Sequence, residues 1–283
     1  MTIEQIFKDY TQQLQCIYDA REAAYITDWV FESVAGIKRL DRITNAKKEL
    51  DSSITERLNN KLSGLLLHKP VQYVLEEAWF YKMKFFVNKN VLIPRPETEE
   101  LIEWVVTQLK REKGKLKIID IGTGCGCIAI ALKKELPDAD VLAIDVSAEA
   151  LSVARQNALD LTSNIKFLQI NFLDEAEWHK LSSFDIIVSN PPYIPEKDKS
   201  KMKKNVVDYE PHLALFVKDD DPFIFYKKIA EFAQLHLKKD GLIYVEVHEE
   251  YAEMVKEIFN RHLLTSIIKQ DIYGRNRMIL AKR

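Results

Sequence analysis

The sequence predicts an α/β fold, in which a mostly parallel sheet follows a small helical bundle and a β-hairpin. Three observations predict it. Apolar residues recur at helical spacing through about the first 75 of the 283 residues. Short apolar runs rich in β-branched residues then alternate with helical segments, which is typical of parallel sheets. The last two runs, 263–271 and 278–281, are joined through Tyr273 and Gly274 and indicate a terminal antiparallel hairpin.

Residues 1–75 are expected to form the helical bundle. Ile3, Ile6, Tyr10 and Leu14 fall on one helical face. Gly36 is expected to end a second helix, since glycine readily takes the left-handed conformation of a helix end. The run Asp51-Ser52-Ser53 resembles a helix start, and the apolar face after it would consist of Ile54, Leu58, Leu62 and Leu65.

Residues 76–96 are expected to form a β-hairpin linker. The aromatic runs 79–81 and 85–87 are the candidate strands, although no glycine or asparagine lies between them to favour a tight turn. Pro94 and Pro96 stiffen the segment that follows. Pro96 is compatible with the first turn of the next helix, so we expect a domain boundary here.

Residues 97–283 are expected to form the sheet domain. A helix is predicted over 128–135, and the predicted strands are 117–121, 141–145, 165–170, 184–190 and 241–247. Strands that alternate with helices in this way favour an open sheet covered by helices on both faces.

Composition excludes several classes of protein. Lys and Arg number 41 and Asp and Glu 43, so the net charge of −2 does not favour direct nucleic-acid binding. The basic stretch 197–204 is expected to be a solvated loop. Cys16, Cys125 and Cys127 predict neither a disulfide framework nor a metal site. Because the sequence shows no apolar stretch of signal-peptide or membrane-spanning type, we expect a cytoplasmic protein.

A glycine-rich loop and an acidic residue predict a nucleoside ligand. Gly122-Thr123-Gly124-Cys125-Gly126 follows the first strand of the domain, where glycines let a ligand approach the backbone. Asp145 ends the next strand and can accept hydrogen bonds from ribose hydroxyls. The spacing G-x-G-x-G departs from the dinucleotide pattern G-x-G-x-x-G and is similar to the loop of class I methyltransferases.

That similarity implies S-adenosyl-L-methionine as cofactor, with the loop holding its methionine end. Asp120, just before the loop, fits the same site, although it could instead cap the turn. Asn171 and Phe172 follow the next strand, where such enzymes meet the adenine amino group and ring. Plain core packing is the alternative for Phe172.

The segment Asn190-Pro191-Pro192-Tyr193 follows the apolar run 184–189 and is the candidate catalytic motif. The proline after Asn190 favours an extended backbone, which leaves a row of oxygen acceptors beside an aromatic ring. This arrangement suits a planar –NH2 group. A strand-ending turn without function is the alternative.

Taken together, these motifs resemble the HemK-type N5-glutamine methyltransferases, which modify peptide-chain release factors. The resemblance covers about residues 70–283. Its segments are Pro70–Leu75, Phe85–Val91, Leu92–Glu99, Gly122–Gly126, Asp145, Asn157–Ala158, Ser189–Ile194, Tyr209–Pro211, Ala214–Leu215, and Gly274–Arg275 with Arg277.

The resemblance implies a Rossmann-like domain with a seven-stranded sheet. It also implies methyl transfer from S-adenosylmethionine to the glutamine of the Gly-Gly-Gln motif, with S-adenosylhomocysteine as product. The Asn190 side chain and the Pro191 carbonyl would accept the two amide N–H bonds. Pro192 and Tyr193 would pack against the glutamine, and Asn190 would also border the cofactor. The bundle would dock a class-1 release factor, and we expect a monomer.

Three alternatives remain open at this point. The same motif would serve a methyltransferase acting on a ribosomal-protein glutamine. It would also suit an adenine N6-methyltransferase on DNA or RNA, although the charge balance speaks against that. A binding protein without catalysis is the third.

Overall fold

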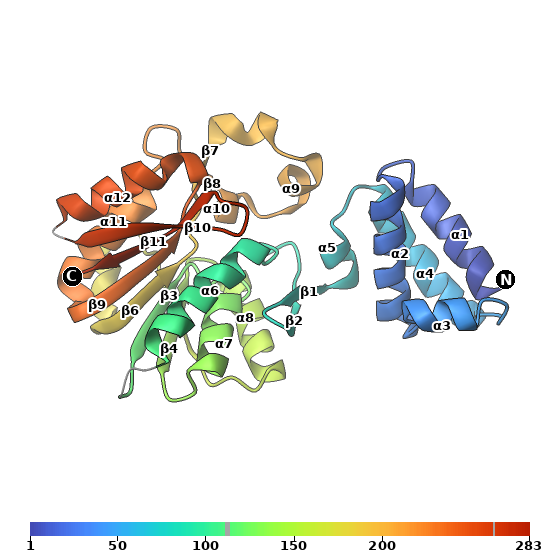
Figure 1. Cartoon of the computed structure of the whole chain (residues 1–283), viewed down its shortest axis with the longest axis horizontal. Coiled ribbons are helices and arrows are strands. Elements are labelled where there is room, and N and C mark those ends of the chain that lie inside the picture. The colour runs from blue at the N-terminus through green and yellow to red at the C-terminus, as the bar shows by residue number, and fades with distance from the viewer. Residues whose placement is uncertain (111–113, 263) are drawn as a thin grey trace. The chain divides into compact units, whose positions relative to one another are not determined.

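The computed structural model describes residues 1–110, 114–262 and 264–283. The chain forms two compact units. The first comprises Met1–Glu77 with Lys203–Tyr209, and the second comprises Ala78–Met202 with Glu210–Arg283. Figure 1 follows the chain through both. Leu263, where the terminal hairpin was predicted to begin, lies outside the described residues.

The first unit is helical. Its helices are α1 (Ile3–Leu14), α2 (Ala20–Ala35), α3 (Arg39–Thr44), α4 (Ser52–Leu66), α5 (Val71–Leu75) and α9 (Lys204–Tyr209). Side-chain caps begin three of them: Thr2 with Gln5 in a capping box, Asp19, and Asp51. The predicted stop at Gly36 is confirmed, with φ of 68°. The fully buried Phe31 packs edge-on against Phe7 and Tyr10 at the centre of the bundle.

The predicted hairpin exists, but its strands begin two residues earlier than expected, as β1 (Glu77–Phe80) and β2 (Met83–Phe86). The turn explains the shift. Tyr81 and Lys82 both take positive φ, 48° and 61°, as the two central residues of a tight hairpin turn do. Neither residue type signals such a turn, so the aromatic pattern alone placed the strands too late.

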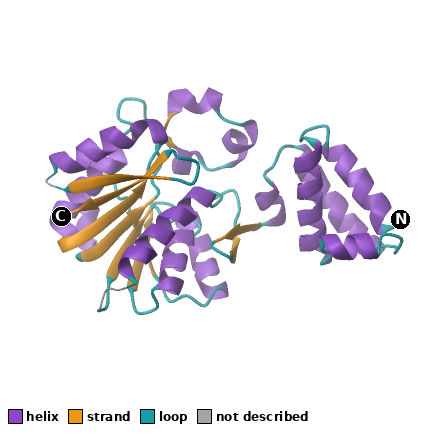
Figure 2. Cartoon of the chain, viewed as in Figure 1, coloured by secondary structure: helices purple, strands orange, loops and turns teal. Residues whose placement is uncertain are grey.

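The second unit is built on a seven-stranded sheet in the order β10-β11-β9-β6-β3-β4-β5. Figure 2 shows its strands in orange between purple helices. The five strands from β9 to β5 are parallel, while β11 runs antiparallel to both β9 and β10. This confirms the predicted sheet and its terminal hairpin. The strands are β3 (Lys117–Ile121), β4 (Asp140–Asp145), β5 (Lys166–Gln169), β6 (Phe184–Ser189), β9 (Leu237–Glu246), β10 (Thr265–Gln270) and β11 (Asn276–Lys282).

Helices cover both faces of the sheet. The helices α6 (Pro96–Leu109), α7 (Cys127–Glu135) and α8 (Ala148–Asp160) lie on one face, and α11 (Ile224–His236) and α12 (Ala252–Arg261) lie on the other (Figure 1). Pro96 is in the first turn of α6, as predicted. The shorter elements are η1 (Glu175–Lys180), β7 (Ile194–Pro195), η2 (Glu196–Lys201), α10 (His212–Leu215), β8 (Phe216–Val217) and η3 (Glu249–Tyr251).

The basic stretch 197–204 is not the loop that was expected. Most of it forms the 3-10 helix η2, in which Lys201 and Asp198 form an ion pair with an N–O distance of 2.6 Å. Asp198 is the single acidic residue beside five lysines in 197–204, so the stretch remains net positive although it is helical.

The strand order places two strand ends beside one another at the centre of the sheet. The chain runs from β3 outward through β4 and β5, then returns to the other side of β3 as β6. Ile121 pairs with Ser189, so the loops that follow β3 and β6 start side by side. Ligands of open α/β sheets bind at such a reversal, outside the carboxyl ends of the strands.

Candidate functional site

A cavity of about 580 Å³ opens at the carboxyl ends of β3, β4, β5 and β6. It lies at the reversal of strand order and is mostly apolar, with polar groups on the strand ends. The predicted site residues that line it are Gly122, Gly124, Asp145, Asn171, Phe172, Asn190, Pro191 and Pro192. Motifs up to 70 positions apart in the sequence are therefore brought to one site.

The glycine loop follows β3 and forms one wall. Gly124 has φ of 55° and faces open space, whereas a side chain added at Gly126 would meet Ala154 of α8 at 3.2 Å. Gly124 thus leaves the backbone accessible to a ligand, and Gly126 permits close packing of the helix. Asn157 of α8 donates a hydrogen bond to the Cys125 carbonyl at 2.9 Å, which fixes the loop from outside the cavity.

Asp120 and Thr123 lie behind the loop rather than in the cavity lining. Asp120 is fully buried, and its Oδ2 accepts a hydrogen bond of 2.6 Å from the Thr123 hydroxyl. Its Oδ1 is buried without a partner among the described residues. Burial raises the pKa of Asp120 to about 7, and the nearby Asp145 carboxylate adds to the shift. A cationic ligand group nearby would stabilise the ionised carboxylate and lower this pKa.

Asp145 ends β4 and lines the cavity. Its two carboxylate oxygens accept hydrogen bonds from the backbone N–H groups of Gly124 and Ser147, each at 2.9 Å. Burial raises its pKa, and these bonds oppose the rise. Each oxygen keeps a further lone pair, so the carboxylate can accept ribose hydroxyls while it holds the loop.

Asn171 and Phe172 form the far wall, after β5. The N–H of Asn171 donates to Glu177, and its Oδ1 accepts from the backbone N–H of Leu173. Phe172 is buried and stacks on Trp178 with ring centroids 5.6 Å apart. Phe172 is therefore both a core residue and a cavity residue, so the two readings of it are not exclusive.

The Asn190-Pro191-Pro192-Tyr193 segment begins where β6 ends, next to the glycine loop. The Ser189 hydroxyl donates to the Ile121 carbonyl at 2.7 Å, which ties the two strand ends together. Asn190 donates through Nδ2 to the Thr98 hydroxyl at 3.1 Å. Tyr193 is outside the cavity lining, and its hydroxyl donates to Glu246 at 3.3 Å.

Three residues near this segment were given no role from the sequence, although Thr98 and Glu210 lie in segments that carry the resemblance. Thr98 and Glu246, each 2% exposed, are hydrogen-bonded to one another at 2.6 Å. Glu210 accepts from Arg95 at 2.5 Å and from the backbone of Ile93. The signal for Glu246 was a lone carboxylate within the apolar run 242–247, since buried carboxylates need partners.

Within residues 1–110, 114–262 and 264–283, no group of three or more His, Cys, Asp or Glu side chains is placed to hold a metal ion. In the same ranges, no helix is both long and apolar enough to cross a membrane.

Sequence comparison identifies the family. Residues 100–209 match the family model of the methyltransferase small domain. The release factor glutamine methyltransferase of Flavobacterium psychrophilum is 42% identical over 282 residues, which are 99% of this chain and 98% of the relative. This chain belongs to the release factor glutamine methyltransferase family. Another member, from Bacteroides thetaiotaomicron, is 39% identical over 96% of this chain and 97% of its own length.

Membership confirms the resemblance predicted from the motifs, and solved structures confirm the fold. A methyltransferase from Pyrococcus furiosus matches with a TM-score of 0.51 at 18% identity, over 82% of this chain and 98% of its own.

Proposed function

We propose that this protein transfers a methyl group from S-adenosyl-L-methionine to the side-chain amide nitrogen of the glutamine in the Gly-Gly-Gln motif of class-1 peptide chain release factors. The product of the cofactor is S-adenosyl-L-homocysteine. One observation carries the proposal: Asn190, Pro191 and Pro192 line the same cavity as the glycine loop and Asp145. Family membership of nearly the full chain supports the same assignment.

The residues of the cavity fit the cofactor. The exposed backbone at Gly122 and Gly124 would receive its methionine end, Asp145 its ribose, and Asn171 with Phe172 its adenine. Asp120, Thr123, Cys125 and Gly126 would act by holding the loop in place. When bound, the cofactor supplies a methyl group activated by a positively charged sulfur.

Catalysis would rest on placement of the substrate amide. The nitrogen of a carboxamide is a weak nucleophile because its lone pair is delocalised into the carbonyl. The Asn190 side-chain oxygen and the Pro191 carbonyl would accept its two N–H bonds and aim the nitrogen at the methyl group. The same oxygens stabilise the positive charge that develops on nitrogen during transfer.

Tyr193 lies outside the cavity lining and would support this pair of acceptors from within the protein. Its ring packs on the core of the sheet domain, and its hydroxyl donates to Glu246. Burial raises the pKa of Tyr193 above its ordinary value, which keeps the hydroxyl protonated as a donor. Tyr193 therefore serves as a structural donor to Glu246 rather than as a base.

The parts of the chain would divide the work. We propose that residues 1–75 dock the release factor, residues 76–96 link the parts, and residues 97–283 carry out the transfer. The protein would act as a monomer and touch no nucleic acid directly. These assignments rest on the helical character of the first unit and on the near-neutral charge.

The test is transfer of a labelled methyl group to purified proteins. The panel contains a release factor, the same factor with its motif glutamine changed to alanine, ribosomal proteins, and duplex DNA and RNA. We expect label in the unmodified release factor alone. Label in a ribosomal protein or in a nucleic acid, with none in the release factor, would replace the proposed substrate by one of the alternatives.

A further inference from the structure

A chain of hydrogen bonds runs from Asn190 away from the cavity into the protein. Asn190 Nδ2 donates to Thr98 Oγ1 at 3.1 Å, and Thr98 Oγ1 donates to Glu246 Oε2 at 2.6 Å. Thr98 and Glu246 are each only 2% exposed. They come from different elements: Thr98 from the first turn of α6, and Glu246 from the end of β9, the strand beside β6.

The direction of this chain decides which end of the Asn190 amide faces the cavity. A threonine hydroxyl has a single hydrogen. Because Thr98 gives that hydrogen to the Glu246 carboxylate, its oxygen can meet Asn190 only as an acceptor. Asn190 must then turn its NH2 toward Thr98, which leaves Oδ1 for the cavity.

We propose that Thr98 and Glu246 are positioning residues that fix the orientation of the Asn190 amide, so that its oxygen faces the substrate amide. The consequence for catalysis rests on the proposed function above. With the amide reversed, its NH2 would face the NH2 of a substrate carboxamide, and two donors cannot pair.

Charged and polar groups from every element packed against Glu246 face it, and all but Glu97 stabilise its carboxylate or backbone. These are Thr98 and the like-charged Glu97 on α6, Tyr193 after β6, Arg277 on β11, and Tyr226 on α11, whose hydroxyl donates to the Glu246 backbone carbonyl at 3.0 Å. Arg277 in turn forms an ion pair with Asp271 and donates a hydrogen bond to the Val247 carbonyl.

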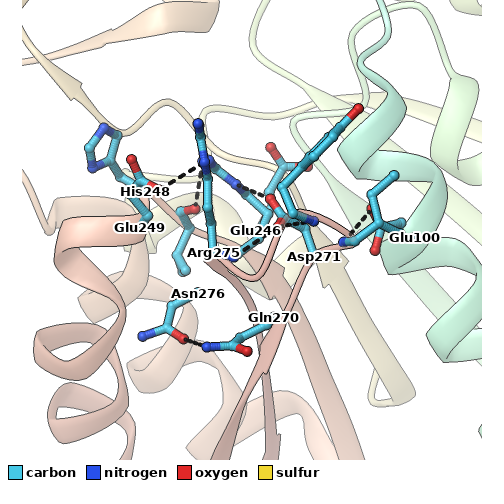
Figure 3. A network of polar contacts seen from close by, with 12 residues as sticks. Glu100, Glu246, His248, Glu249, Gln270, Asp271, Arg275 and Asn276 are labelled. Atoms are coloured by element: carbon cyan, nitrogen blue, oxygen red, sulfur yellow. Dashed lines mark hydrogen bonds and ion pairs between the residues drawn. The ribbon is translucent and has the colours of Figure 1, made fainter.

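Asp271 anchors the turn of the neighbouring hairpin. Figure 3 shows it close to Glu246, with Glu100 and Arg275 in the same polar network. Asp271 Oδ1 accepts from the backbone N–H groups of Tyr273 and Arg275, and Glu100 accepts from the backbone N–H of Ile272. The carboxylate of Glu246 thus lies beside a network that holds Arg277 in place.

The geometry carries a pH dependence. Burial raises the pKa of Glu246 to about 6, against the opposing effects of Thr98 and Arg277. Above this pH the carboxylate can only accept, and the order of donors is fixed. Below it, a protonated Glu246 can donate to Thr98, which frees the Thr98 hydrogen to donate to Asn190 Oδ1 and reverses the amide. Activity should therefore fall as the pH drops through about 6.

A purely structural role for these two residues makes a different prediction, namely that any variant that folds is active. Two variants of Thr98 separate the possibilities. Thr98→Val keeps the shape and removes the hydroxyl, while Thr98→Ser keeps the hydroxyl and removes a methyl group. Glu246→Gln can both donate and accept, so it no longer imposes one direction, and it does not titrate.

The first arm of the test measures methyl transfer to a release factor from about pH 5 to pH 8, with cofactor affinity measured separately. We expect Thr98→Val to lose about 10- to 100-fold in kcat/KM with unchanged cofactor Kd, since hydrogen bonds in a chain that ends on a charge are of this size. Thr98→Ser should stay within about twofold of the wild type. Glu246→Gln should lose activity, and its remaining activity should not fall as the pH drops through about 6.

The second arm does not depend on the substrate. In protein labelled with 15N-asparagine, the Asn190 side-chain NH2 signal, assigned through Asn190→Ala, should be protected from exchange in the wild type and in Thr98→Ser but not in Thr98→Val. Its shift in the wild type should titrate near pH 6. The proposal is overturned if the Asn190 signal is affected neither by Thr98→Val nor by pH. Equal kcat/KM in Thr98→Val and the wild type would also overturn it, as would a Thr98→Ser protein as inactive as Thr98→Val. A wild-type protein inactive on release factors, with the expected NMR behaviour, would overturn only the proposed function.

Discussion

The substitutions Asp145→Ala and Asp145→Asn test the proposed cofactor site directly. In the structure each of its oxygens holds one backbone N–H, that of Gly124 or that of Ser147, and each has a lone pair left toward the cavity. Asp145→Ala removes the hydrogen bonds to Gly124 of the glycine loop and to Ser147, together with the proposed acceptors for the ribose. Asp145→Asn keeps one acceptor oxygen and nearly the same shape.

The size of the effect follows from these contacts. A hydrogen bond to a charged group contributes about 1.5–3 kcal/mol. Loss of the ribose interaction in Asp145→Ala should therefore weaken the Kd for S-adenosylmethionine by about 10- to 150-fold. Asp145→Asn should fall between this variant and the wild type, because its NH2 repels one of the two backbone donors.

The measurement is calorimetric titration with S-adenosylmethionine and with S-adenosylhomocysteine at one pH. Thermal unfolding of each variant in the absence of ligand separates a loosened loop from a lost contact. The matched control is Glu149→Gln, since Glu149 also lines the cavity but holds no backbone N–H of the glycine loop among the described residues. An Asp145→Ala protein that binds both ligands as tightly as the wild type would show that this carboxylate is not the ribose acceptor.

Three further predictions concern the substrate acceptor, an ion pair and the hairpin turn. Asn190→Ala should lower kcat by about 10²- to 10³-fold while the cofactor Kd changes little, because one acceptor of the amide is lost; kinetics alongside calorimetry measure both, and unchanged kcat removes Asn190 from its role. Arg95→Ala should destabilise the fold by about 2 kcal/mol in urea unfolding, because Glu210, 1% exposed in its side chain, loses its ion-pair partner; Lys115→Ala, which breaks an exposed pair with Asp140, is the control and should cost about 0–1 kcal/mol. Lys82→Gly should raise stability by about 0.5 kcal/mol, because the φ of 61° strains a lysine more than a glycine; Lys82→Ala keeps the strain, so a gain in both variants would refute this reason.

Much of the fold follows from patterns within single segments. The run 117–121 is short, apolar and followed by glycines, and it forms β3 as predicted. The hairpin strands were misplaced because the residues in its turn, Tyr81 and Lys82, adopt positive φ without the residue types that favour it. The stretch 197–204 was expected to be a loop because it is rich in lysine. The ion pair between Lys201 and Asp198 that supports η2 forms only in the folded helix, and the charge pattern does not indicate it.

The site was predictable only where chemistry is concentrated in one motif. The glycine loop, Asp145 and Asn190 each lie at the carboxyl end of a strand, and a parallel sheet brings these ends to one edge, so the sequence predicted that they converge. Thr98 and Glu246 could not, because they are 148 positions apart and meet only after α6 packs beside β9. Nothing in either local sequence indicates the partner.

The central claim is that a pair of oxygen acceptors at Asn190 and Pro191 directs a methyl group to a glutamine side-chain nitrogen. Tandem mass spectrometry of a release factor, incubated with the wild-type protein and S-adenosylmethionine, tests it most directly. We expect one added methyl group, located on the side-chain amide of the glutamine in the Gly-Gly-Gln motif, and almost none with Asn190→Ala. A methyl group on another residue, or equal modification by the two proteins, would contradict the account.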